Sequence, residues 1–71
     1  MKYLVVVEKS ENGYGAYVPD LPGCVAASET RTEVVALIQE AIEFHIDGLK
    51  ASGESVPPAK SQSEVVEVHA A

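Results

Sequence analysis

The chain has 71 residues, with 11 acidic against 5 basic side chains, a net charge of −6 and one cysteine. A chain of this length forms one small domain that buries only about 60% of the surface its unfolded form exposes. We therefore predict a single domain, residues 1–71, that gains stability by self-association. The lone Cys24 excludes an internal disulfide, and the acidic charge disfavours direct binding to nucleic acid.

No part of the sequence indicates a membrane segment, a metal or a cofactor. The apolar run YLVVV at residues 3–7 is too short for a signal peptide or a membrane span. Two histidines and one thiol do not form a zinc-binding pattern. We expect a cytoplasmic protein that contacts no membrane and holds neither metal nor cofactor.

Residues 3–18 predict a β-hairpin. The first arm contains the β-branched run Val5–Val7, and Asn12-Gly13 is expected to supply the positive φ angles of a type I′ turn. Pro19 ends the second arm, because proline has no amide to donate to a strand ladder. Apolar residues fall on both faces of the first strand, which is typical of a central strand or of one covered by another molecule.

A turn and a short strand follow the hairpin. In Leu21–Cys24, proline and glycine stand where a type II turn requires a fixed φ and a positive φ. We interpret Asp20 as a turn residue whose carboxylate accepts backbone amides. Residues 24–28 are small and predict a short strand.

A helix is predicted from Thr30 to Ser52. Thr30 and Glu33 have the spacing of a capping box, and Gly53 followed by prolines is a stop signal. The helix carries an apolar stripe with two further apolar residues on its flanks, an arc wider than one small sheet would cover. From this stripe and its flanks we predict an oligomer interface made by Phe44, His45, Ile46 and Leu49.

The sequence EVVEVHA, residues 64–70, predicts a last strand after a polar connection. The element order is therefore β-β-β-α-β, an α+β fold with a mostly antiparallel sheet and one helix on one face. The helical connection would allow the last strand to lie parallel to the first.

The residue types that carry catalysis do not form a recognisable constellation. His45 lies on the apolar stripe, His69 near the chain end and Cys24 after a turn, and we interpret all three as structural or merely exposed. An open alternative is a degenerate metal-dependent nuclease that uses Asp20 with a second carboxylate. We predict no catalytic residues and no enzymatic activity.

The segment GYGAYVPDLPGCVAASETRTEVVALIQEAIEFHIDGLKASGESVPP closely resembles the N-terminal domain of HicB-like antitoxins. The most specific part is PDLPGC, with the helix-capping threonine six positions after its cysteine. The resemblance implies a partial RNase H-like fold, a homodimer or homotetramer, and binding to a small basic HicA-like toxin that cleaves mRNA. We expect the toxin to contact Glu8, Glu11, Asp20, Leu21 and Pro22.

Two departures from the family pattern shape this expectation. The chain stops at Ala71 without the DNA-binding segment that full-length members usually carry, so we expect no direct binding to operator DNA. The carboxylate set of an active RNase H is also not evident, so the fold does not imply nuclease activity. A further alternative is an orphan regulatory homo-oligomer without a toxin.

Overall fold

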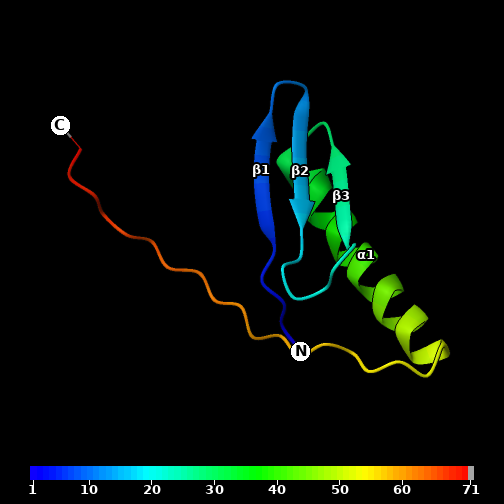
Figure 1. The fold of residues 1–71 in the computed structure, drawn as a ribbon. Helices are drawn as coiled ribbons and strands as arrows, with labels where there is room; N and C mark the ends of the chain where they lie inside the picture. Colours follow the sequence, from blue (N-terminus) through cyan, green and yellow to red (C-terminus); the bar gives the residue numbers. More distant parts are fainter. Residues whose placement is uncertain (71) are drawn as a thin grey trace.

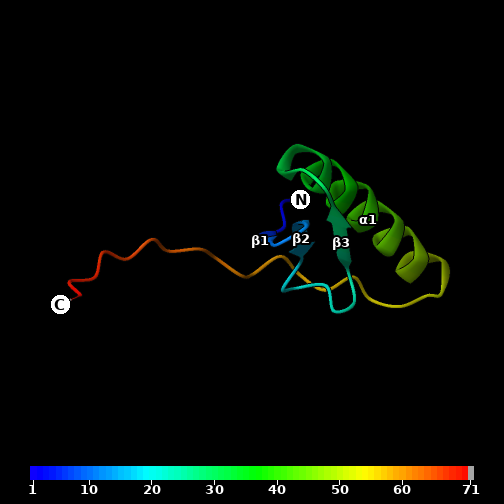
Figure 2. The same ribbon diagram turned by 90° about the horizontal axis from the view of Figure 1, so that it is seen from above.

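The computed structural model describes residues 1–70. It contains three strands, β1 (Val6–Ser10), β2 (Gly13–Tyr17) and β3 (Val25–Ser28), followed by one helix, α1 (Arg31–Ala51). The strands form an antiparallel sheet in the order β1-β2-β3, and α1 crosses one face of it (Figures 1 and 2). The predicted α+β class, with an antiparallel sheet and one helix on one face, is confirmed.

The hairpin between β1 and β2 forms as predicted, but its turn is different. Ser10 pairs with Gly13, so Glu11 and Asn12 are the two turn residues. No residue other than glycine has a positive φ among the described residues, which rules out a type I′ turn over Asn12-Gly13. A glycine is required at position 13 because a Cβ there would collide with the Ser28 carbonyl oxygen of β3.

The close approach at position 13 gives a stability prediction. Gly13→Ala should lower the free energy of unfolding by about 1 to 3 kcal/mol, because the methyl group must displace backbone at a φ of 155°. Gly48→Ala is the matched control, since nothing lies within 4 Å of a Cβ on Gly48 in the helix. It should raise stability by about 0.5 to 1 kcal/mol. Urea titrations of both variants measure the difference, and an unchanged midpoint for Gly13→Ala would contradict the steric account.

Two successive turns connect β2 to β3. The Leu21 amide donates to the Val18 carbonyl at 3.1 Å and the Cys24 amide donates to the Leu21 carbonyl at 3.1 Å. The Val18 amide closes the loop by donating to the Cys24 carbonyl at 3.2 Å. Gly23 has a φ of 84°, so the predicted type II turn over LPGC is confirmed. The double turn directs the Leu21 side chain inward, where it is fully buried.

Both ends of α1 follow the predicted capping. The Thr30 hydroxyl oxygen accepts from the Glu33 amide at 3.1 Å and donates to the Glu33 carboxylate at 2.9 Å. At the other end Gly53 has a φ of 72°, and its amide donates to the Lys50 carbonyl at 3.1 Å. The next amide, of Glu54, reaches the Leu49 carbonyl at 2.9 Å, which completes a Schellman motif.

The hydrophobic core is small and lies between the sheet and the helix. Three side chains are almost completely excluded from solvent, Leu21 of the loop and Val34 and Ile38 of α1. The remaining buried residues are Ala16, Val18 and Cys24. The helix packs over β2 and β3, and its contact with β1 is slighter. The β1 side of the helix is therefore incompletely covered.

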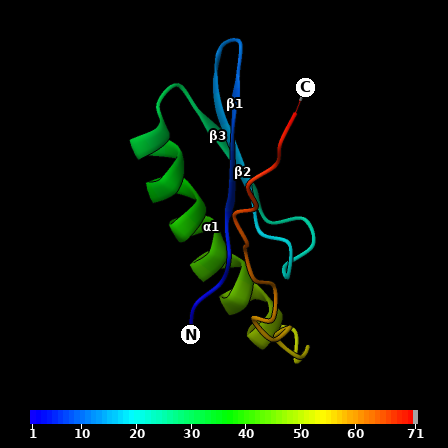
Figure 3. The same cartoon turned by 90° about the vertical axis from the view of Figure 1, so that its left-hand side faces the viewer.

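The predicted last strand over residues 64–70 is not formed. Residues 54–70 contain no strand, turn or bend, and every residue from Gln62 to Ala70 is exposed. They pass below the lower end of the sheet and then run outward, on the side of the sheet opposite to α1 (Figures 1 and 3). The prediction of a last strand is therefore wrong for the single chain, because a strand requires a partner edge and these residues do not lie along β1.

Candidate functional site

Asp20 binds the C-terminal segment to the β2–β3 loop. Its Oδ2 atom accepts from the amides of Lys60 at 2.9 Å and Ser61 at 2.8 Å, and its Oδ1 atom accepts from the Ser61 hydroxyl at 2.7 Å. The Tyr3 hydroxyl donates to the Pro57 carbonyl nearby. Asp20 thus accepts backbone amides, as predicted, but from a segment some forty positions later in the chain.

These bonds also set the charge of Asp20. Hydrogen bonds from the Ser61 amide and hydroxyl, together with the Lys60 amide, favour the carboxylate and lower the pKa of Asp20 below its ordinary value. A depressed pKa means that the stabilisation is complete above the unfolded-state pKa and is lost as the pH falls through the lowered value. The attachment should therefore persist from neutral pH down to about pH 4 and be lost below it.

Asp20→Ala should release residues 57–61 from the domain without unfolding it, since the buried core does not include them. The measurement is amide hydrogen exchange, in which the Lys60 and Ser61 amides should lose their protection. In the unaltered chain the same two amides should lose protection below about pH 4. Asp47→Ala, on the exposed side of α1, serves as the control. Protection that survives in Asp20→Ala would contradict this assignment.

The structure separates the residues predicted to bind a toxin. Glu8 and Glu11 belong to β1 and its turn, whereas Asp20 and Pro22 lie in the loop at the opposite end of the sheet (Figure 1). Glu8, Glu11 and Pro22 are exposed, and Asp20 is half-buried beneath Ser61. Leu21 is fully buried, so its side chain supports the loop from within the core.

The exterior of the domain is acidic and its carboxylates are largely unpaired. Within residues 1–70 the only ion pair joins the His69 and Glu67 side chains at 4.0 Å, and it forms only when His69 is protonated. The other acidic side chains form no ion pair within these residues. Those on β1, the connections and the helix are exposed, namely Glu8, Glu11, Glu29, Glu33, Glu40, Glu43 and Asp47.

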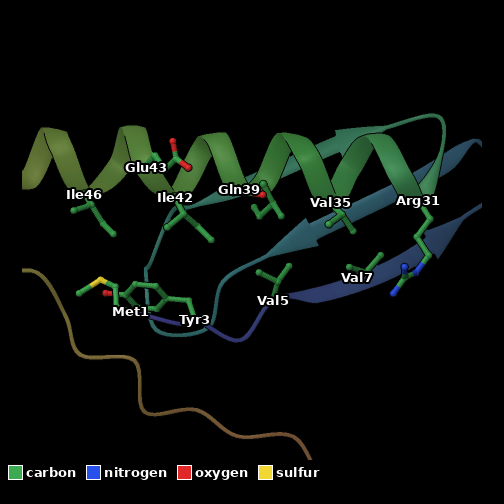
Figure 4. A pocket seen from close by; sticks show the side chains of 11 residues that line it. Met1, Tyr3, Val5, Val7, Arg31, Val35, Gln39, Ile42, Glu43 and Ile46 are labelled. Atoms are coloured by element: carbon green, nitrogen blue, oxygen red, sulfur yellow. The ribbon is translucent and has the colours of Figure 1, made fainter.

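A first apolar groove runs between β1 and α1. Val5 and Val7 project from the strand side toward Val35, Ile42 and Ile46 of the helix (Figure 4). Its volume is ≈ 570 Å³. The groove exists because α1 packs over β2 and β3 and leaves the outer side of β1 with no element beside it. We call it the β1 groove.

A second apolar groove lies on the other flank of α1, beside the free edge of β3. It is lined by residues that include Val25, Leu37 and Phe44, and the Phe44 side chain is 82% exposed. Phe44 and Ile46 thus lie on opposite flanks of the helix, one in each groove. His45 and Leu49 are half-buried along the inner side. The four residues predicted as one oligomer interface do not share one surface.

The sheet face opposite to α1 carries a further apolar row. The strand register aligns Val6, Tyr17 and Val25 across all three strands. Tyr17 and Val25 are 41% and 65% exposed. The two-sided apolar pattern of the first strand is therefore explained. One set of its side chains points toward the helix, and the other set lies on the uncovered face of the sheet.

The described residues contain neither an activated thiol nor a metal-binding cluster. Burial raises the pKa of the Cys24 thiol, which keeps it protonated and weakly nucleophilic. Across residues 1–70 no three side chains of the types His, Cys, Asp and Glu are grouped closely enough to hold a metal ion. Over the same range no helix combines the length and the hydropathy of a membrane span. What the surface offers is apolar grooves and unpaired carboxylates.

Comparison with known proteins identifies the family. Residues 3–70 match the family model described as HicB-like antitoxin of bacterial toxin–antitoxin systems. The chain belongs to this family. An UPF0150 protein of Thermoplasma acidophilum is 41% identical over 71 residues, which is 99% of this chain and 100% of the relative. Family membership indicates a role in a toxin–antitoxin system and favours a non-enzymatic one.

Other relatives of the HicB-like chain are longer. An uncharacterised protein of Haemophilus phage HP1 is 42% identical over 80% of this chain and 43% of its own length. Antitoxin HicB 2 of Photorhabdus laumondii is 31% identical over 99% of this chain and 51% of its own length. This HicB-like chain therefore spans about half the length of these two relatives.

A solved structure confirms the fold of the HicB-like chain. One chain of a HicA3 and HicB3 toxin–antitoxin complex superposes with a TM-score of 0.72 at 32% identity. The match covers 83% of this chain and 70% of the other. The sheet and helix described above are therefore an arrangement found in a toxin–antitoxin complex.

Proposed function

We propose that this HicB-like chain binds and neutralises a small, basic HicA-type toxin that cleaves mRNA. The observation that carries the proposal is the fold match to a chain of a toxin–antitoxin complex, together with the family match over residues 3–70. The chain would act by covering the RNA-binding or catalytic surface of the toxin rather than by chemistry of its own. A toxin that cleaves mRNA acts in the cytoplasm, and the HicB-like chain would act there too.

The charge distribution supports a basic partner. The chain carries a net charge of −6, and its exposed carboxylates have few cationic neighbours within residues 1–70. Opposite charges on two partners accelerate encounter and select against partners of the wrong sign. Glu8 and Glu11 are the carboxylates that we assign to this contact, since both are exposed at the hairpin. Pro22 is exposed in the β2–β3 loop and gives a second, separate surface, whereas the carboxylate of the neighbouring Asp20 already accepts hydrogen bonds from Lys60 and Ser61.

Co-expression with a small basic HicA-type toxin is the direct test. We expect the two chains to copurify, and the HicB-like chain to restore growth that the partner alone suppresses. A control uses the partner with its basic surface residues replaced by glutamate, which should prevent copurification while both proteins stay folded. If the two intact chains neither associate nor restore growth, the proposal is wrong.

The apolar surfaces favour a second role, that of a regulatory homo-oligomer. Phe44 at 82% exposure and the row through Tyr17 and Val25 leave apolar side chains in water that a second copy could cover. Self-association and toxin binding are compatible, because the apolar surfaces and the exposed carboxylates are different residues. No observation favours the nuclease alternative, because the Asp20 carboxylate accepts hydrogen bonds from the Lys60 and Ser61 amides.

A further inference from the structure

The outer edge of β1 is an unoccupied strand-pairing site. β1 pairs with β2 alone, so the peptide groups on its other side have no strand partner. Exposed edges are usually protected by charged residues or proline. The hairpin half of β1 carries the charged residues Glu8 and Lys9, whereas residues 3–7, which run up to and into the other half, carry no charge and no proline. Tyr3, Val5 and Val7 of this stretch also line the β1 groove, so the uncharged part of the edge adjoins the groove (Figure 4).

The C-terminal arm, residues 62–70, is an extended segment that has no strand to pair with among residues 1–70. It is extended and exposed, and it makes no hydrogen bond to the domain within the described part of the chain. Val65, Val66 and Val68 are 96%, 70% and 76% exposed. β-branched residues in an extended segment suit a strand. In a single chain, however, no hydrogen bond or apolar contact offsets the conformational entropy that this segment would lose on becoming ordered.

The geometry points to a pairing partner in another molecule. The hydrogen bonds from Lys60 and Ser61 to Asp20 fix the start of the arm below the sheet. From there the arm continues without a turn or bend, past the β1 edge and away from the domain (Figures 1 and 2). Reaching its own β1 edge would require a corner at Gln62-Ser63, where no glycine or proline favours one.

We propose that the arm of one copy adds as a strand to the β1 edge of a second copy. Side chains alternate along a strand, so Val66 and Val68 share one face and Val65 lies on the other. Val66 and Val68 would enter the β1 groove, while Val65 would join Leu4 and Val6 on the uncovered face. Glu67 and His69 would remain at the solvent side.

The arm has the length that this exchange requires. Residues 62–70 in extended form span about 30 Å, and a five-residue strand such as β1 spans roughly 17 Å. Each copy would give one arm and accept one, so two copies form a closed dimer with no free β1 edge. The exchange would supply the fourth strand that the sequence pattern predicts, contributed by another molecule.

Sedimentation of the purified chain at micromolar concentrations tests the proposal without a toxin. We expect a dimer, and Val66→Lys combined with Val68→Lys should raise its dissociation constant at least about a hundredfold. The matched control is Glu64→Lys with Glu67→Lys, which changes charge in the same arm and spares the valines. Thermal unfolding followed by circular dichroism should show that the monomeric double-valine variant remains folded.

Isotope-filtered NMR separates exchange from folding back within one chain. In a mixture of differently labelled copies, we expect contacts between the Val66 and Val68 methyl groups and those of Val5 or Val7 on another molecule. A monomer in sedimentation, contacts only within one molecule, or a dimer that tolerates both valine substitutions would overturn the proposal. An arm that becomes protected only when a toxin is added would overturn it too.

Discussion

Leu21→Ala is expected to destabilise the domain by about 2 to 5 kcal/mol. Leu21 is fully buried in a core with only two other side chains of comparable burial, Val34 and Ile38. Removing its branched end leaves a cavity between the β2–β3 loop and the helix, and the double turn holds the backbone in place so that the site collapses poorly. Since a domain of this size rarely has more than about 3 to 5 kcal/mol in reserve, a large unfolded fraction is expected at 25 °C.

Pro22→Ala is the matched control in the next position. Pro22 is exposed at the second position of the type II turn, so its loss should cost at most about 1 kcal/mol, through the entropy of the unfolded chain. Urea titrations monitored by circular dichroism compare the two. The two variants also show whether Leu21 acts through folding or through direct contact with the partner. Any loss of partner binding in Leu21→Ala should vanish after correction for the folded fraction. Equal midpoints for the two variants would contradict the assignment of Leu21 to the core.

Charge reversal at Glu8 and Glu11 is expected to weaken binding to a basic partner by about ten- to a hundredfold at low salt. Both carboxylates are exposed on β1 and its turn and have no cationic partner within residues 1–70. Replacing each by lysine converts attraction to repulsion at the contact. The effect should shrink as salt is raised, because charges separated by more than about 10 Å are screened at 0.1 M. Titration calorimetry at several salt concentrations measures both quantities.

The control for this prediction reverses two carboxylates elsewhere. Glu40→Lys with Glu43→Lys changes the net charge equally, but on α1, and should reduce affinity much less. Equal losses in the two double variants would show that net charge alone, rather than the hairpin, attracts the partner. Such a result would leave the proposed antitoxin role intact and remove only the assignment of Glu8 and Glu11.

Local signals in the sequence were sufficient for most of the secondary structure. Thr30 with Glu33, and Gly53 after Ser52, fix the ends of α1 by hydrogen bonds between residues a few positions apart. Pro22 and Gly23 fix the type II turn by their own backbone preferences. Such interactions depend on neighbours in the chain, which explains why pattern and spacing predict them.

The predicted site residues show the limit of this reasoning. Asp20 was recognised as an acceptor of backbone amides, yet nothing in the sequence indicates that Lys60 and Ser61 would supply them. Leu21 belongs to a family-specific stretch, but its burial follows from the direction of a double turn. Gly13 was assigned to a turn, whereas the Ser28 carbonyl on another strand is what requires it.

The sequence by itself determined the helix and its two ends, the hairpin, the LPGC turn and the acidic exterior, because these depend on local preference and composition. Only the tertiary structure decided which face each apolar residue occupies and where the C-terminal arm goes. Residues 64–70 are rich in β-branched valine, which suits a strand, but this composition does not name the edge with which a strand pairs. That choice depends on the packing of α1 and on the hydrogen bonds that hold Lys60 and Ser61 to Asp20. It also depends on which β1 edge the arm can reach, that of its own chain or that of another copy.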